Sequence, residues 1–197
     1  MTKYAHLSDD RLYALVSAVD GDSSAANGAA DSEAAFRELY TRHGRRVHAY
    51  CVRIVGNETH AEDIFQETFV RFFNAAKAGE RTMTNVPAFL LRIARNLCLN
   101  YKRDIRSTVS ILDEDFAHAP HDYDSSELLS LITTALELLD HEQREAFVLR
   151  KYQDLSYEEI ADLTNTTANN ARSRVHRAQQ RIREILAPYL TDLNQHL

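Results

Sequence analysis

Apolar side chains recur every three or four residues along most of the chain, which is the spacing of one face of an α-helix. Few residues interrupt this spacing, because the sequence contains only five glycines and three prolines. Helical spacing prevails over the alternation of apolar and polar residues that marks a half-buried strand. The pattern therefore predicts an all-α protein.

Breaks in this pattern predict two small helical domains joined by an acidic, flexible linker. We expect the first domain at residues 31–106, the linker at 107–126 and the second domain at 127–190. The linker segment contains several acids and a proline and lacks a periodic apolar face. Residues 1–30 are expected to form a short helix followed by a flexible loop.

The N-terminal helix should begin after Ser8, a suitable N-cap, and end at Gly21. Its apolar residues are Leu12, Leu15, Val16 and Val19. The following stretch, 22–31, is rich in Ser, Ala, Asn and Gly, so it has little to bury and is predicted to be a flexible loop. This helix either covers an apolar patch of the first domain or serves regulation. Covering is favoured, because exposed Leu and Val ordinarily need a packing partner.

The first domain should hold three helices, at residues 36–55, 60–78 and 88–103. Thr59 and Glu62 form a capping-box pattern before the second of these helices. Gly79 can close that helix, and Pro87 fits the first turn of the third. In the second domain two further capping boxes are expected, at Asp140 with Gln143 and at Ser156 with Glu159.

Charge is distributed unevenly along the chain. The formal net charge of -6, from 23 basic and 29 acidic side chains, argues against a surface that attracts nucleic acid everywhere. Residues 164–183, however, contain five arginines and no acid. This block predicts a local DNA-facing surface.

The sequence predicts neither a metal site nor a cofactor. Cys51 and Cys98 lie within apolar stretches, outside any CxxC pair, and are expected to be buried thiols in a reducing compartment. No apolar run approaches the roughly 20 residues that span a bilayer, and the N-terminus lacks a signal-peptide core. We therefore expect a cytoplasmic protein without membrane insertion.

Residues 155–183 have the pattern of a helix-turn-helix: a short helix, the turn 164–166, and a basic helix after Thr167. Asn165 is a residue type that tolerates the left-handed backbone of a tight turn, and Thr167 can cap the second helix. The core-facing side of the second helix should carry Ala171, Val175, Ala178 and Ile182.

The other sides of this basic helix are expected to contact DNA. Its candidate residues are Asn169, Asn170, Arg172, Ser173, Arg174, His176, Arg177 and Arg181. Arg172, Ser173, His176 and Arg177 are well placed for base edges in the major groove. Arg174, Arg181 and Arg183 are assigned to phosphates or to nearby acids. The alternative is an ordinary helical hairpin with a solvated arginine face.

This part of the chain reads LLDHEQREAFVLRKYQDLSYEEIADL and, after the turn, ARSRVHRAQQRIREIL. These motifs resemble region 4 of the extracytoplasmic-function (ECF) sigma factors, the part that reads the minus 35 promoter element. The turn departs from the family, which usually has a leucine, a glycine and an aliphatic residue where this chain has Thr164, Asn165 and Thr166.

The helix predicted at 60–78 contains AEDIFQETFVRFF, with four phenylalanines on a wide apolar stripe. From the residues alone, its polar face would be assigned to solvent. The motif resembles sigma region 2.2, which implies that Asp63, Gln66 and Glu67 contact the clamp helices of the largest polymerase subunit.

The third helix contains AFLLRIARNLCLNYKR and carries a basic stripe that can track phosphates. It resembles sigma region 2.4, and the loop 80–86 corresponds to region 2.3. The resemblance implies contacts with the minus 10 element from Thr84, Asn85, Arg92, Arg95, Asn96, Lys102 and Arg103. Phe89 stands where the family often has tryptophan.

Together these resemblances imply an alternative sigma factor that binds core RNA polymerase, at the clamp helices and the flap region, and promoter DNA. They also imply an anti-sigma partner and no enzymatic activity. A dimeric helix-turn-helix regulator that binds an operator is the first alternative. An enzyme is the second, although no phosphate-binding loop, metalloprotease or nucleophile motif is present.

Overall fold

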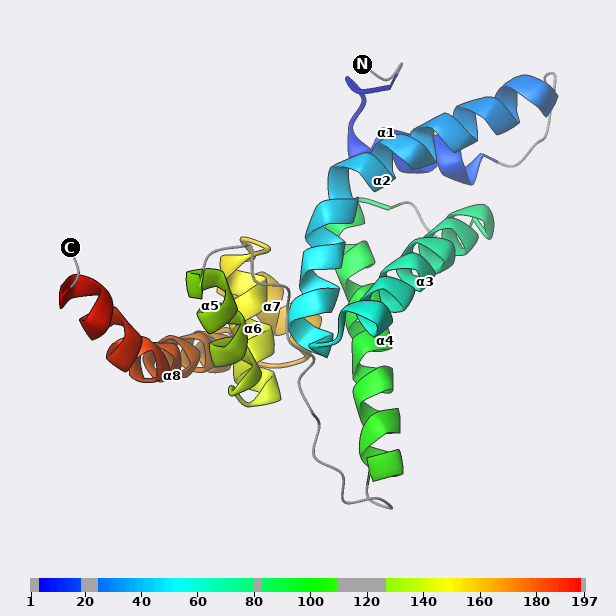
Figure 1. Cartoon of the computed structure of the whole chain (residues 1–197). Helices are drawn as coiled ribbons and strands as arrows, with labels where there is room; N and C mark the ends of the chain where they lie inside the picture. The colour runs from blue at the N-terminus through cyan, green and yellow to red at the C-terminus, as the bar shows by residue number, and fades with distance from the viewer. Residues whose placement is uncertain (1–3, 19–24, 80–82, 110–126, 196–197) are drawn as a thin grey trace. The chain divides into compact units, whose positions relative to one another are not determined.

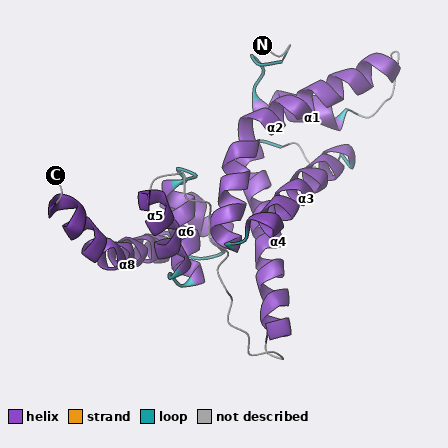
Figure 2. Ribbon diagram, in the orientation of Figure 1, coloured by secondary structure: helices purple, strands orange, loops and turns teal. Residues whose placement is uncertain are grey.

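The computed structural model shows eight α-helices and no strand within the residues that it describes, which are 4–18, 25–79, 83–109 and 127–195 (Figures 1 and 2). The all-α prediction is confirmed for this part of the chain. Contacts divide the chain into two compact units, Met1–Lys102 and Arg103–Leu197. Unit 1 contains α1 (Asp9–Ser17), α2 (Ala25–Val55), α3 (Glu58–Lys77) and most of α4 (Val86–Val109).

The core of unit 1 is built around the aromatic stripe of α3. Phe65, Phe69 and Phe72 are buried, as their spacing predicts. The ring of Tyr13, from α1, meets Phe72 edge-on at 5.7 Å, and Phe36, from α2, lies 6.4 Å from the same ring. Edge-on and offset aromatic pairs contribute about 0.5–1.5 kcal/mol each beyond burial itself. These rings therefore join α1, α2 and α3 in one core.

The N-terminal helix α1 packs on α2 and α3. Leu12 and Val16 are fully buried, and Leu15 is half-buried. Val19 and Gly21 lie outside the described residues; α1 itself ends at Ser17. The helix thus covers an apolar face of the bundle, which is the first of the two roles that its sequence allowed.

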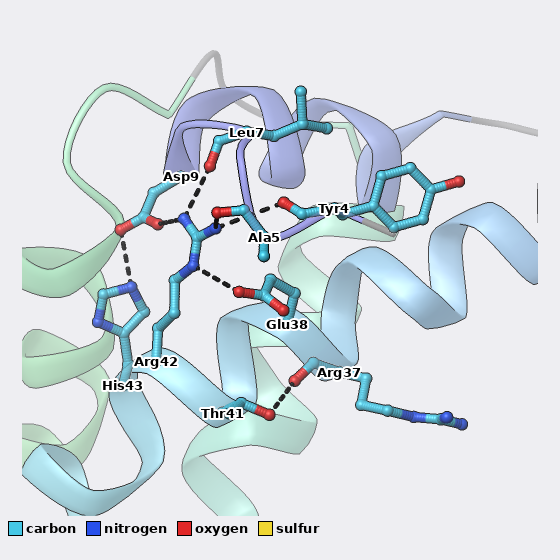
Figure 3. Close-up of polar contacts among 9 residues, drawn as sticks. All are labelled: Tyr4, Ala5, Leu7, Asp9, Arg37, Glu38, Thr41, Arg42 and His43. Carbon is cyan, nitrogen blue, oxygen red and sulfur yellow. Dashed lines mark hydrogen bonds and ion pairs between the residues drawn. The ribbon is translucent and has the colours of Figure 1, made fainter. Parts of the chain in front are cut away.

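A single arginine of α2 fastens the N-terminal segment to the bundle (Figure 3). Arg42 donates from Nε to Glu38 at 2.9 Å and from Nη1 to Asp9 at 2.9 Å. The other carboxylate oxygen of Asp9 lies 2.7 Å from Nε2 of His43. Desolvation lowers the pKa of Arg42, but its bonds to Glu38 and Asp9 outweigh that effect and raise the pKa above its ordinary value.

The same guanidinium also hydrogen-bonds the backbone that precedes α1. It donates to the carbonyls of Leu7 at 2.8 Å, Ala5 at 2.9 Å and Tyr4 at 3.4 Å. The hydroxyl of Tyr4 in turn donates to the carboxylate of Asp31, in α2. Arg42 therefore bonds three backbone carbonyls of the segment before α1 and fixes the path of the chain into that helix.

Helix α2 begins at Ala25, so the prediction of a flexible loop over 22–31 is wrong for its described part. Alanines at four of the first six positions favour the helix. Tertiary contacts add to this preference, because Ser32 is buried and its hydroxyl donates to the carbonyl of Val16 at 3.4 Å. The extra turns are thus held against α1 rather than exposed on all sides.

The N-terminus of α3 differs from the predicted capping box of Thr59 and Glu62. Asn57 is the N-cap, and its side chain accepts a hydrogen bond from the amide of His60 at 3.0 Å. Gly56, at φ +78°, turns the chain so that Asn57 is extended and adjacent to the first helical turn. Asn is as strong an N-cap as Ser or Thr, and here it lies closer to the turn.

The other helix ends in unit 1 follow the prediction more closely. Gly79, at φ +67°, closes α3, and Pro87 lies in the first turn of α4. Asn85 caps α4 by accepting from the amide of Ala88 at 3.0 Å. Helix α4 continues to Val109, beyond the residue where the linker was expected to begin. Residues 110–126 of that linker lie outside the described residues.

Unit 2 contains α5 (Glu127–Glu137), α6 (His141–Lys151), α7 (Tyr157–Thr164) and α8 (Ala168–Gln195). Helix α8 packs against the other three helices. Around it, one apolar cluster consists of Leu136, Leu139 and Ala178, with Ile132, Phe147, Tyr152 and Ile182 against them. Buried Arg144 donates to the carbonyls of Glu137 and Leu139 and so caps the C-terminal end of α5.

The predicted capping box at Asp140 and Gln143 does not form. Asp140 occupies the N-cap position of α6, but its side chain accepts no backbone amide. The side-chain Nε2 of Gln143 instead donates to the Asp140 carboxylate at 3.1 Å. The two side chains therefore satisfy each other, whereas a capping box would have each of them bond the backbone.

We predict that Arg42→Met releases the N-terminal segment and destabilises α1 by about 2 kcal/mol, because charge-assisted bonds to two carboxylates and three carbonyls are lost. Native-state hydrogen exchange of the α1 amides measures this opening. Arg37→Met is the matched control, since among the described residues the Arg37 side chain makes only an exposed ion pair with Glu33 in the same helix. Unchanged α1 protection in Arg42→Met would contradict the anchoring role.

Candidate nucleic-acid and partner-binding surfaces

The predicted helix-turn-helix is present at α7 and α8. Ser156 and Glu159 form the predicted capping box: the Ser156 hydroxyl accepts from the Glu159 amide at 3.1 Å, and the Glu159 carboxylate accepts from the Ser156 amide at 2.7 Å. Asn165 ends α7 in the left-handed conformation, at φ 53° and ψ 50°. The turn is closed by the amide of Thr166, which donates to the carbonyl of Ala161 at 3.0 Å.

The start and the rotation of α8 also follow the prediction. The hydroxyl of Thr167 accepts from the amide of Asn170 at 3.2 Å, which caps the helix. The core-facing residues are buried, or in the last case packed against the core: Ala171, Val175, Ala178 and Ile182. Because this face is fixed against the other helices of unit 2, the opposite face of the first turns must point outward.

The outward face of α8 carries polar side chains that bond nothing within the described part of the chain: Asn169, Ser173, His176 and Arg177. All four are exposed. Their spacing of three, four and seven residues gives a continuous stripe along two turns. The stripe offers amide, hydroxyl, imidazole and guanidinium groups, which are the groups that read base edges.

The remaining predicted residues of α8 already have partners inside unit 2. Arg174 is paired with Glu142 of α6 at 2.7 Å, and Arg181 with Glu184 at 3.2 Å. Pairing with acids is one of the two roles expected of these arginines. Arg172 lies over the ring of Tyr157, and the side-chain Nδ2 of Asn170 donates to the hydroxyl of Thr166 at 3.3 Å.

The residues of the predicted basic stripe lie on α4. Arg92, Asn96 and Arg103 are exposed, whereas Arg95 and Lys102 are half-buried. Thr84 and Asn85 are exposed just before the helix. Because the Asn85 side-chain oxygen caps α4, its NH₂ group is the part that remains for a ligand.

The polar face of α3 carries the three residues assigned to polymerase. Asp63 and Gln66 are exposed and Glu67 is half-buried. Glu67 is paired with Arg71 at 2.7 Å, and Gln66 donates to Glu62 at 3.0 Å. Among the described residues Asp63 has no hydrogen-bond or ion-pair partner, so its charge remains available to another molecule.

An apolar groove between α2 and α3 adjoins this face. Its lining includes Phe36, Tyr40, Phe69, Val70 and Phe73, together with Gln66. Val70 is 52% exposed and Tyr40 43% exposed, although both are large apolar side chains. Sequence reasoning assigned the aromatic stripe to the core and missed the groove. The available signal was Val70, an apolar residue seven positions after Asp63 on the same helix face.

The described residues contain no group of three or more His, Cys, Asp or Glu that could hold a metal ion. Cys51 and Cys98 are buried free thiols, as predicted. None of the described helices is long and apolar enough to cross a membrane.

Comparisons with known proteins match both units. The family model for Sigma-70 region 2 matches residues 39–108, and that for Sigma-70, region 4 matches residues 129–182. The ECF RNA polymerase sigma factor SigE of Mycolicibacterium smegmatis is 34% identical over 80% of this chain, which spans 64% of that protein. The RNA polymerase sigma factor CarQ of Myxococcus xanthus is 34% identical over 77% of this chain and 89% of its own length.

A solved structure is also similar: the sigma factor RpoE in complex with the anti-sigma factor NepR, from Bartonella quintana. It has a TM-score of 0.67 and 27% sequence identity, and the alignment covers 77% of this chain and 96% of that chain. Helix α1 and the first turns of α2 lie before the first residue of either family-model match.

The left-handed residue of the turn gives a stability prediction. Asn165→Ala should destabilise unit 2 by about 1 kcal/mol, because a Cβ without a local hydrogen-bonding side chain is unfavourable in the left-handed region. Asn165→Gly should be neutral or slightly stabilising, because glycine adopts that region freely. The free energy of unfolding of the two variants is compared by urea unfolding, with hydrogen exchange of the α7 and α8 amides as the readout. Equal effects of Ala and Gly would show that the backbone conformation is not what matters here.

Proposed function

The chain belongs to the ECF sigma factors of the sigma-70 family, and we propose that its two units divide promoter recognition between them. As an alternative sigma factor, it binds core RNA polymerase and recognises promoter DNA so that transcription starts. In the proposal, residues 127–190 act as region 4 on the minus 35 element and residues 31–106 act as region 2 on the minus 10 element. The observation that carries it is the outward stripe of unpartnered polar side chains on α8.

Recognition of the minus 35 element is assigned to the N-terminal half of α8, which enters the major groove. Arg172, Ser173, His176 and Arg177 read base edges, with Asn169 and Asn170 at the entry of the helix. Arg181 contacts phosphate, and Arg174 contributes by bracing α8 against α6 through Glu142. The support is the exposure of these residues, Arg174 excepted, and their position away from the buried face.

The minus 10 element is assigned to the surface formed by α4 and the residues before it. The phosphates of a melted strand are contacted by the stripe of α4, which consists of Arg92, Arg95, Asn96, Lys102 and Arg103. Thr84 and Asn85 contact unstacked bases. The cap that Asn85 makes to α4 supports this assignment, because it ties Asn85 to the helix whose basic stripe would hold the strand.

Core polymerase is assigned to the polar face of α3, at Asp63, Gln66 and Glu67, which dock on the clamp helices of the largest subunit. Unit 2 contacts the flap region. The unpartnered carboxylate of Asp63 supports this face, as does the neighbouring groove with its exposed Val70 and Tyr40. A charged rim beside an exposed apolar surface is typical of a protein–protein interface.

The protein acts by binding alone, without catalytic activity, in the cytoplasm where polymerase and promoters are found. We further propose an anti-sigma protein as a regulatory partner. The support is the similar sigma factor of Bartonella quintana, whose structure was solved with such a protein.

We expect Asp63→Arg to weaken binding to purified core polymerase about a hundredfold, because it replaces the unpartnered carboxylate of the proposed docking face by a larger group of opposite charge. Run-off transcription should be lost in parallel. Asp10→Arg is the matched control, since it makes the same charge change at an exposed position of α1. Wild-type affinity in Asp63→Arg would remove the α3 face from the interface.

Arg172→Ala should reduce discrimination between promoters with intact and substituted minus 35 elements by roughly tenfold, because a paired contact to guanine is lost. Arg181→Ala should instead weaken all promoters alike and make binding less dependent on salt. Competition between promoter templates in run-off transcription measures both effects. A symmetric footprint on duplex DNA without any binding to core polymerase would favour an operator-binding regulator.

A further inference from the structure

The ring of Tyr157 lies between two arginines from different helices of unit 2. The guanidinium carbon of Arg172, in α8, is 5.0 Å from the centre of the ring, and that of Arg150, near the end of α6, is 5.3 Å from it. Both distances lie within the range of attractive cation–π contacts. Tyr157 is the first residue of α7, so the three side chains link α6, α7 and the first turns of α8.

Neighbouring hydrogen bonds fix the backbone that carries this ring. The capping box of Ser156 and Glu159 fixes the first turn of α7, and with it the backbone of Tyr157. Arg150 donates from Nη1 to the carbonyl of Leu155 at 3.0 Å, just before that turn. The ring therefore projects from a fixed helix start and has Arg150 as a second neighbour. Arg172, by contrast, is exposed and has no ion-pair partner among the described residues.

An exposed arginine has many rotamers, and binding DNA must restrict them to one. A contact with a fixed ring restricts the rotamers beforehand. A guanidinium that lies over a ring uses its face for the contact and keeps its N–H donors at its edge. Those edge donors are the groups that bond N7 and O6 of guanine.

We propose that Tyr157 is a positioning residue for promoter recognition: it holds the Arg172 guanidinium over its ring so that the N–H edge is oriented before DNA binds. The inference rests on the proposed role of Arg172 in reading the minus 35 element. It adds a residue of the first helix of the motif, outside the basic block, to the determinants of specificity.

The test is a double-mutant cycle in reconstituted holoenzyme, with competing promoter templates that differ at the minus 35 element. Tyr157→Leu should lower discrimination about three- to fivefold, because the ring is removed. Tyr157→Phe should keep wild-type discrimination, because the ring remains. In the Arg172→Ala background, Tyr157→Leu should lower discrimination no further.

Three results would overturn the positioning role. Wild-type discrimination in Tyr157→Leu would show that the ring does not matter, and an equal loss in Tyr157→Phe would assign the effect to the hydroxyl. An undiminished effect of Tyr157→Leu in the Arg172→Ala background would show that Tyr157 acts independently of Arg172. Each of these three results leaves the proposed function intact, provided that the single variant Arg172→Ala reduces discrimination. If Arg172→Ala has no effect either, the base-reading assignment fails together with the inference.

Discussion

Each helix must bury one apolar face, and this requirement sets which residues of α3 and α8 face outward. In α8, burial of Ala171, Val175 and Ala178 leaves only one possible outward face. In α3, burial of the phenylalanine stripe turns Asp63 outward in the same way. The direction of each surface thus follows from the apolar face that its helix buries. A core substitution that rotates either helix would therefore redirect a whole binding surface.

Arginines of similar intrinsic chemistry have different roles because their neighbours differ. Arg42 and Arg144 satisfy backbone carbonyls and belong to the scaffold. Arg174 is paired with an acid of another helix, whereas Arg177 bonds nothing in the described part of the chain. Charge counting along the sequence cannot separate these cases. The basic block of α8 is thus a smaller reading surface than its five arginines suggest.

Local signals were sufficient to predict the helix-turn-helix, because Asn165, Thr167 and the capping box each act within a few residues. Prediction failed where the start or the cap of a helix depends on residues far away in the sequence, or on two local capping patterns that compete. The early start of α2 depends on contacts of Ser32 with α1, and the Arg42 cluster joins residues more than thirty positions apart. At α3 two capping patterns overlapped, and the turn at Gly56 selected Asn57. Residue types reveal neither long-range partners nor the path of the backbone.

The N-terminal segment and the candidate polymerase surface are parts of one structure. The groove beside Gln66 is walled on one side by Ala29, Ser32, Glu33 and Phe36, which come from the first turns of α2. Those turns are held by the contacts of Tyr4 with Asp31 and of Ser32 with Val16. Loss of α1 would therefore remove the support of that wall, although α1 itself does not line the groove. A helix that lies outside both family-model matches thus supports one wall of a surface whose other wall, α3, lies within the match to region 2.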